Sequence, residues 1–238
     1  MILRLKILPS FILLACLGVA ITLSAQSVSA NTAVKDDVFV TEYLKRAQNG
    51  EIRAQLVLGN LFLHGEGIFQ KPENAFKWFH QAALNGDKLA QFNLGTLYQE
   101  GVGTIVDNQK ALKWFLKVVE PDTGGDKTGL SSEILAWTHL KLGLIYYEGN
   151  GTPVNYTEAM KWFKIASYNN HAFGQYMTGL MYGAGRGVEK DDQLAIYWLK
   201  TAADQGFESA KAALKPYLQE RLENQGSQIS LYPTLAAL

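Results

Sequence analysis

Residues 94–103 read Leu-Gly-Thr-Leu-Tyr-Gln-Glu-Gly-Val-Gly, and variants of this string recur along the chain. The first glycine of the string recurs at intervals of 36, 48 and 36 residues, and a tryptophan 19 residues further on keeps the same intervals. The two series are Gly59, Gly95, Gly143 and Gly179, and Trp78, Trp114, Trp162 and Trp198. One structural unit is therefore copied four times, with an insertion after the second copy, which predicts a stacked array.

Each copy is predicted to be a pair of helices. In the first copy, Ala54, Leu58 and Leu61 lie on one face at helical spacing, and a turn at Gly65 and Gly67 ends the helix. The same Gly-x-Gly turn recurs at Gly101/Gly103, Gly149/Gly151 and Gly185/Gly187. No alternating strand pattern separates the helices, so we expect an all-α fold.

The second helix of each pair is marked by its start and by its tryptophan. Residues that favour the N-cap position precede it at Asp107, Asn155 and Asp191, and the pattern Ala-x-x-Trp follows. The recurring glycine, in contrast, lies inside the first helix, where glycine costs roughly 1 kcal/mol against alanine. We therefore expect these four interior glycines to let two helices approach closely, with an aromatic ring above each of them.

The string L-G-x-x-Y-x-x-G-x-G, followed by A-x-x-W and A-x-x-x-G, resembles the Sel-one-like repeat (SLR), a relative of the tetratricopeptide repeats. Four full copies cover residues 53–206. The resemblance implies a right-handed α-solenoid of antiparallel helix pairs, a fold used for assembling protein complexes.

Half-copies flank the four repeats. Residues 31–52 are predicted to form an N-terminal capping helix, and residues 207–225 a C-terminal capping helix with a polar end. Residues 226–238 are predicted to form a flexible tail. The insertion, residues 121–132, is rich in Gly, Asp, Thr and Ser, which predicts an exposed loop.

The first 30 residues have the pattern of an export signal. Arg4 and Lys6 precede an apolar run over residues 7–23, and small residues end at Ala30, where we expect cleavage. The mature protein would then be periplasmic or secreted. Two alternatives remain open, a retained membrane anchor and a lipoprotein acylated at Cys16, which follows a weak lipobox.

Composition argues against several classes of function. The chain has 22 basic and 22 acidic residues, so it offers no electrostatic footprint for nucleic acid. Cys16 is the only cysteine, and the four histidines are scattered, so no metal site is predicted. The glycine-rich turns join two helices and therefore do not match phosphate loops. We predict no catalytic residue and no cofactor, and hence a protein that is not an enzyme.

The predicted binding site lies on the first helices, on the stripe that lines the concave side of such solenoids. This stripe is rich in apolar and aromatic residues, which is typical of a contact site for another protein or peptide. The predicted apolar anchors are Phe92, Trp137, Tyr147 and Tyr176, and the predicted polar contacts to a peptide backbone or carboxylate are Asn60, Asn93 and Lys141. A second interpretation is that neighbouring units or the C-terminal tail cover the stripe.

Two other functions remain as alternatives to an exported scaffold that binds a partner's peptide segment. One is a cell-wall-related enzyme or a β-lactam-binding protein, like the cysteine-rich secreted branch of the Sel-one-like repeat family. This chain lacks the cysteines of that branch. The other is an array that mainly displays its insertion loop. The partner, the pathway, the oligomeric state and the side of the envelope stay open at this level.

Overall fold

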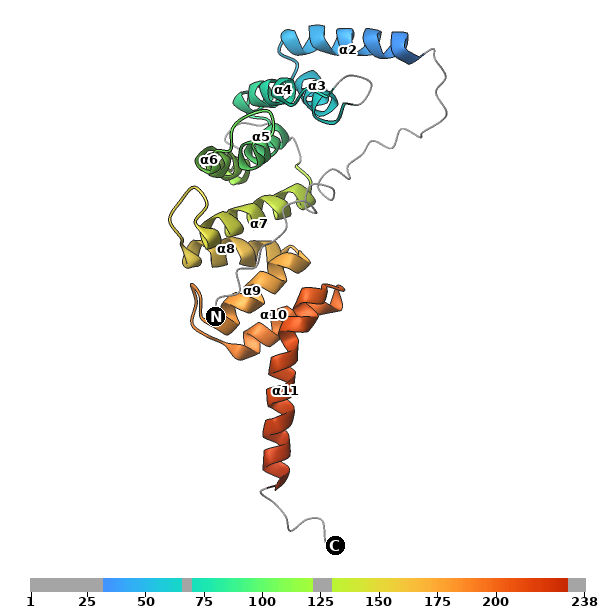
Figure 1. Ribbon diagram of the computed structural model, residues 1–238. Helices are drawn as coiled ribbons and strands as arrows, with labels where there is room; N and C mark the ends of the chain where they lie inside the picture. Colours follow the sequence, from blue (N-terminus) through green and yellow to red (C-terminus); the bar gives the residue numbers. More distant parts are fainter. Residues whose placement is uncertain (1–31, 66–69, 122–129, 231–238) are drawn as a thin grey trace.

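The computed structural model describes residues 32–65, 70–121 and 130–230, and within them the side chains of residues 38–65, 70–121 and 130–219. This part of the chain forms ten α-helices and no strand (Figure 1). The helices are α2 (Thr32–Gln48), α3 (Ile52–His64), α4 (Pro72–Leu84), α5 (Lys88–Glu100), α6 (Asn108–Val119), α7 (Ser132–Glu148), α8 (Tyr156–Tyr168), α9 (Ala172–Ala184), α10 (Asp192–Asp204) and α11 (Glu208–Ser230). The expected export signal, with Cys16 and Ala30, lies outside the described residues, and so does the segment 231–238.

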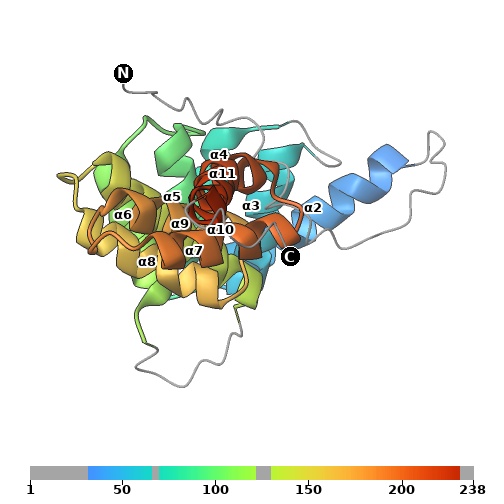
Figure 2. The same cartoon turned by 90° about the horizontal axis from the view of Figure 1, so that it is seen from below.

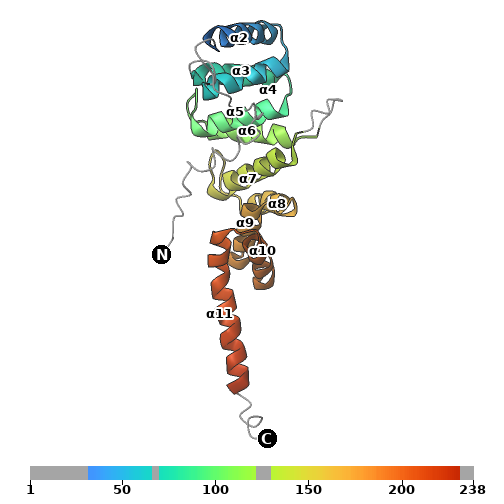
Figure 3. The ribbon, with the colours of Figure 1, turned by 90° about the vertical axis from the view of Figure 1, so that its right-hand side faces the viewer.

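The helices pack as four consecutive hairpins, α3 with α4, α5 with α6, α7 with α8 and α9 with α10. The hairpins stack along one axis, with α2 at one end and α11 leaving the other end (Figures 1 and 3). Seen along that axis, the hairpins lie over one another (Figure 2). The prediction of an all-α repeat solenoid with half-units at its ends is therefore confirmed. In the described ranges, no helix is both long and apolar enough to cross a membrane.

The interior glycines lie against the second helix of their own hairpin, as expected. A Cβ atom on Gly59 would lie 2.6 Å from the ring of Phe79, a distance that real Cβ atoms do not adopt. The same contact recurs in every hairpin, with leucine in place of phenylalanine in the last. The pairs are Gly59–Phe79, Gly95–Phe115, Gly143–Phe163 and Gly179–Leu199. Their large partners are fully buried, so each hairpin is closed by one side chain that fills a glycine notch.

The second glycine of each described turn is required by the neighbouring hairpin rather than by its own. A Cβ atom on Gly103 would lie 2.1 Å from the carbonyl oxygen of Pro72, at the start of α4. Gly151 meets Asn108, and Gly187 meets Tyr156, in the same way. These glycines let each turn lie on the first turn of the preceding hairpin's second helix.

The predicted N-caps are confirmed. The side chain of Asp107 accepts a hydrogen bond from the backbone N–H of Lys110 at 2.9 Å, and Asn155 and Asp191 make the equivalent bond. Each bond satisfies a backbone donor that the first helical turn leaves without a partner. The second helices therefore start at the positions set by their caps.

A recurring glutamine joins successive hairpins. The Nε2 atom of Gln55 donates to the carbonyl oxygen of Ala47 at 3.1 Å, near the end of the preceding second helix. Gln91 and Gln175 repeat this bond at 3.3 Å, to Ala83 and Ser167. The third hairpin has His139 at this position. The spacing of these four residues is again 36, 48 and 36, so the signal was present in the sequence.

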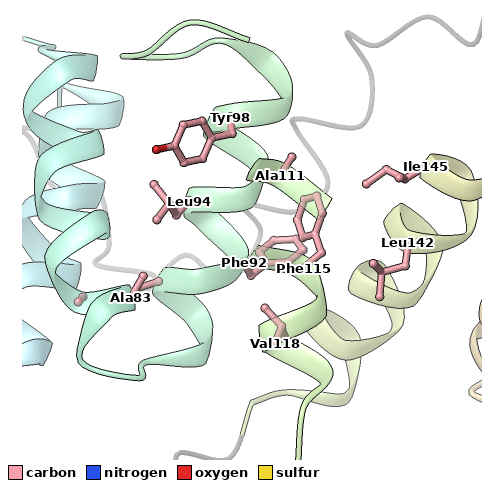
Figure 4. Packing of buried hydrophobic residues seen from close by; sticks show 11 residues of the cluster. Ala83, Phe92, Leu94, Tyr98, Ala111, Phe115, Val118, Leu142 and Ile145 are labelled. Carbon is pink, nitrogen blue, oxygen red and sulfur yellow. The ribbon is translucent and has the colours of Figure 1, made fainter. Parts of the chain in front are cut away.

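The core is continuous across the insertion. Buried side chains of α4, α5, α6 and α7 form one cluster, in which Phe92 and Phe115 face Leu142 and Ile145 (Figure 4). The helix after the insertion has 17 residues instead of 13, and Ser131 caps its start. Ser132, the last residue of the expected loop, therefore belongs to α7, because the extra turn buries part of Ile134 and Leu135 against the core.

The C-terminal helix is longer than predicted. It extends to Ser230, so residues 226–230 continue the helix rather than starting a tail. In the repeat register, Arg221 stands where the four hairpins have the glycine that ends the first helix, and Lys215 replaces the interior glycine. Without the terminating glycine, nothing in the local sequence stops the helix, and Pro216 is accommodated within it. A lysine side chain at this position, unlike glycine, would keep a following helix from packing closely against α11, which suits the end of the array.

Candidate functional site

Each first helix has one accessible stripe. Along α5, this stripe contains Leu89, Asn93 and Thr96, which are half-buried, and Glu100, which is exposed. The equivalent positions on α3, α5, α7 and α9 form four rows along the array, which we call the accessible face. The first row is Arg53, Leu89, Trp137 and Phe173; the second is Val57, Asn93, Lys141 and Met177; the third is Asn60, Thr96, Leu144 and Leu180; the fourth is His64, Glu100, Glu148 and Ala184.

Four of the predicted binding residues lie in the rows of this face, and three of them are half-buried rather than buried. Asn60 and Asn93 are half-buried on α3 and α5. Trp137 is half-buried near the start of α7, and its ring meets the ring of His171 edge-on, with centroids 4.8 Å apart. These three positions keep the accessibility that a contact role requires.

Phe92 does not lie on the accessible face, contrary to the prediction. Its side chain is only 5% exposed and packs 6.0 Å from the ring of Phe115, inside the core (Figure 4). The reason is helical geometry, since each residue turns the side chain by about 100°. The step from Asn93 back to Phe92 therefore points the side chain toward the following hairpin.

Tyr176 occupies the equivalent position on α9 and also packs inward. Its ring lies 5.2 Å from that of Phe207, which leads into α11, and 6.1 Å from that of Phe173. Burial is the main cause that raises the pKa of the Tyr176 hydroxyl. Tyr176 thus joins the capping helix to the last hairpin and is not an open anchor.

Lys141 is only 8% exposed although it occupies the second row. Its Nζ atom donates to Oε1 of Gln99 at 2.9 Å and lies 5.4 Å from the centre of the Phe115 ring. The side chain therefore links α7 to α5 instead of extending from the face. This burial argues against the predicted role of Lys141 in holding a peptide carboxylate.

Tyr147 belongs to an aromatic cluster between the third and fourth hairpins. The rings of Tyr147 and Tyr156 lie 5.3 Å apart, and the guanidinium of Arg186 lies over both. Arg186 also donates a hydrogen bond to the Tyr147 hydroxyl. Arg186 was not predicted as a site residue, because the sequence of its turn gives no sign of a partner 39 residues away.

Two carboxylates end the first helices of the second and third hairpins. Burial raises the pKa of the Glu100 carboxyl, while nearby Lys141 acts in the opposite direction. Burial likewise raises the pKa of Glu148, whose carboxylate accepts a hydrogen bond of 2.6 Å from the Asn150 amide. Both carboxylates are therefore less well solvated than free side chains.

A hollow of about 530 Å³ lies beside α4, with Leu44, Phe62 and Trp78 among its lining residues, away from the predicted binding residues. Among the side chains that the structure describes, no three His, Cys, Asp or Glu residues gather as a metal site would require. The accessible face is therefore the site that the predictions and the geometry share.

The fold defines the class of the protein as an α-solenoid of two-helix repeats with one accessible helical face. The Sel1 repeat matches residues 52–87, 88–117, 139–171 and 172–207, more than half of the chain, so the protein belongs to the Sel1 repeat family. Sel1 repeat proteins are generally scaffolds that bind other proteins and are generally non-catalytic.

A solved structure agrees with this assignment. A Sel1 repeat protein from Oxalobacter formigenes is 28% identical, with a TM-score of 0.62 over 78% of this chain and 74% of that one. A protective antigen of uropathogenic Escherichia coli strains that displays an SLR fold is also 28% identical, with a TM-score of 0.44 over 76% of this chain and 44% of that one. No match was found among the curated proteins.

Proposed function

We propose that this protein is an exported scaffold that binds a peptide segment of a partner protein on its accessible face. The observation that carries the proposal is the run of apolar residues in the first row from α5 to α9. Leu89, Trp137 and Phe173 occupy equivalent positions on successive first helices and are half-buried rather than buried. A partner that covered them would remove more apolar surface from water. Each Å² of apolar surface removed favours binding by about 25 cal/mol.

The rigidity of the face favours binding further. Each first helix is held by an interior glycine contact to its own second helix, and Lys141 bonded to Gln99 joins α7 to α5. A preformed surface avoids much of the ordering cost that a flexible surface pays on association. Trp137 is the central anchor in this proposal, Leu89 and Leu144 flank it, and Asn60 and Asn93 supply amides for a peptide backbone.

Export is the second part of the proposal and is supported by residues 1–30. A basic start, an apolar run and small residues before Asn31 form the pattern that signal peptidases cleave. Mass spectrometry of the protein recovered from its native cell tests this part. A mature N-terminus at Asn31 supports it, an acylated Cys16 would show an exported lipoprotein instead, and an intact residue 1 would contradict cleavage of the signal.

Binding is tested by site-specific photo-crosslinking in the native compartment. A crosslinker at position 96, on the accessible face, is expected to capture a defined partner. The same crosslinker at Tyr168, which is 73% exposed on α8, serves as the control and is expected not to capture it. Equal capture from both positions would argue against the accessible face.

The Trp137→Ala variant measures the contribution of the anchor to the affinity for the captured partner. We expect affinity to fall about tenfold or more, since aromatic anchors carry much of the binding energy of an interface. Circular dichroism checks that the array stays folded. Asn93→Arg, which adds bulk to the face at a half-buried position, gives an independent second variant, and unchanged affinity in both would overturn the proposal.

A further inference from the structure

The two edges of the accessible face differ in character. The first row is apolar from α5 to α9, whereas the fourth row carries carboxylates on α5 and α7. Leu89 and Glu100 are eleven residues apart on one helix, which separates the two rows by about 16 Å. A helix with its side chains is about 10–12 Å across, so a segment lying along the first row reaches the fourth row only through long side chains that extend toward it.

The two carboxylates are close neighbours within the array. Glu100 and Glu148 are the last residues of α5 and α7, and these two helices contact each other directly. The carbonyl groups at a helix C-terminus carry a partial negative charge, which adds to that of a carboxylate there. Adjacent packed helices lie roughly 10 Å apart, so we expect the two exposed acidic residues at about that spacing.

The neighbouring cations also contact other groups of the array. The ammonium of Lys141 is bonded to Gln99 and lies over the Phe115 ring, and its charge opposes the rise in the pKa of the nearby Glu100 carboxyl. The guanidinium of Arg186 covers Tyr147 and Tyr156. At the other end of the face, Arg53 and His64 lie on α3, away from the hairpins that carry the two carboxylates.

We infer that the partner segment bound on this face is amphipathic and basic, with apolar side chains on Leu89, Trp137 and Leu144, and lysine or arginine side chains that reach Glu100 and Glu148. This inference rests on the proposed function and adds the chemistry of the partner. Both residues are exposed, yet incomplete solvation raises the pKa of both carboxyls, and a cation that approached them would stabilise their charged forms. Two basic residues seven apart in a helix, or three apart in an extended chain, match the spacing of about 10 Å.

A displayed library of random peptides, selected on the full mature chain, tests the inference without a known partner. We expect the selected peptides to combine leucine-like residues with lysine or arginine at the spacings given above. Their affinity is expected to fall as salt rises, because exposed charge pairs are screened.

The decisive variant is Glu100→Gln combined with Glu148→Gln, which keeps the shape of both side chains. We expect it to weaken the selected peptides about tenfold at low salt and to remove most of their salt dependence. The matched control is Glu73→Gln with Glu120→Gln, two exposed residues in the first turn of α4 and directly after α6, and should leave affinity unchanged.

The outcomes separate the inference from the proposed function. If peptides bind, lose affinity in Trp137→Ala, and yet are not basic or ignore the glutamine variant, the inference is wrong and the proposed function stands. If the library yields no peptide that depends on Trp137, both are overturned. Basic peptides that depend on Trp137 and on both carboxylates support both.

Discussion

Gln205 donates from its Nε2 atom to Oε1 of Gln175 at 2.6 Å, which completes the bonding of the glutamine that joins the last two hairpins. The first hairpin has Asn85 at the position of Gln205, and there the buried Oε1 atom of Gln55 has no hydrogen-bond partner among the described residues. Asparagine is one methylene group shorter than glutamine. The difference explains why one junction is fully bonded and the other is not.

Asn85→Gln is therefore expected to stabilise the protein by about 1 kcal/mol, the usual net contribution of a hydrogen bond made to a buried acceptor. Urea unfolding followed by circular dichroism measures the change. Gln205→Asn is the reverse variant and is expected to cost a similar amount, because it removes the bond to Gln175. No gain in the first variant and no loss in the second would contradict the explanation.

Gly143→Ala tests the interior glycine contact. A Cβ atom there would lie 2.6 Å from the Phe163 ring, and the resulting overpacking should destabilise the fold by about 1–3 kcal/mol despite the better helix propensity of alanine. Adding Phe163→Leu should recover part of the loss, since Leu199 fills the same place in the fourth hairpin. Thermal unfolding measures both variants, and an alanine variant as stable as the parent would refute the close-approach explanation.

At the scale of helices, the docking of α11 depends on a notch in α9. Gly183 occupies the position that Gln99 and Tyr147 hold in the preceding repeats, and the Tyr217 hydroxyl fills the space of its missing side chain. A Cβ atom on Gly183 would lie 2.1 Å from that hydroxyl. The capping helix thus reaches the accessible side of the last hairpin through one tyrosine.

Gly183→Ala should loosen α11 without unfolding the hairpins. We expect faster amide hydrogen exchange over residues 208–219 and unchanged exchange in α3 to α6. Combining it with Tyr217→Phe should restore much of the protection, because the ring carbon next to the hydroxyl would lie 3.3 Å from the new Cβ. Slow exchange in the single variant would show that the notch does not control docking.

At the scale of the whole molecule, two half-buried histidines make stability depend on pH. Burial lowers the pKa of His139, and it lowers the pKa of His171 against the opposing effect of Glu133. A folded-state pKa below the ordinary value of about 6.5 means that unfolding takes up protons. The free energy of unfolding is therefore not reduced by these histidines above pH 7. It decreases as the pH falls below about 6.5, because the unfolded chain takes up protons first.

We expect the urea midpoint of the wild type to fall between pH 8 and pH 5.5 more than that of the double variant His139→Gln, His171→Gln. Glu100 and Glu148 act in the opposite direction, because their raised pKa values make the folded state bind protons first as the pH falls. Their contribution is common to both proteins and cancels in the comparison. Parallel pH profiles would show that the histidines are not responsible.

The unit and its copy number could be predicted from the sequence because they depend on local chemistry repeated at a constant interval. The N-caps at Asp107, Asn155 and Asp191, the interior glycines and the Gly-x-Gly turns each follow from contacts that one repeat makes with itself or with its neighbour. Four copies of the same signal left little room for another fold.

The binding site was less well predicted because accessibility depends on a rotation of about 100° per residue and on the neighbouring repeats. Asn93 lies on the accessible face, whereas Phe92 is buried beneath the next hairpin, and no sequence pattern separated these two neighbours. Lys141 and Tyr147 were placed on the correct helix, but their partners Gln99 and Arg186 come from other repeats.

The amino-acid sequence by itself determined the helix pairs, their number and their order, since short-range spacing, capping and glycine placement act within about 36 residues. Only the tertiary structure decided which side chains of the first helices stay open and which charges remain at the surface. The physical reason is that burial and electrostatic pairing result from the stacking of whole hairpins, which brings together residues that the sequence keeps far apart.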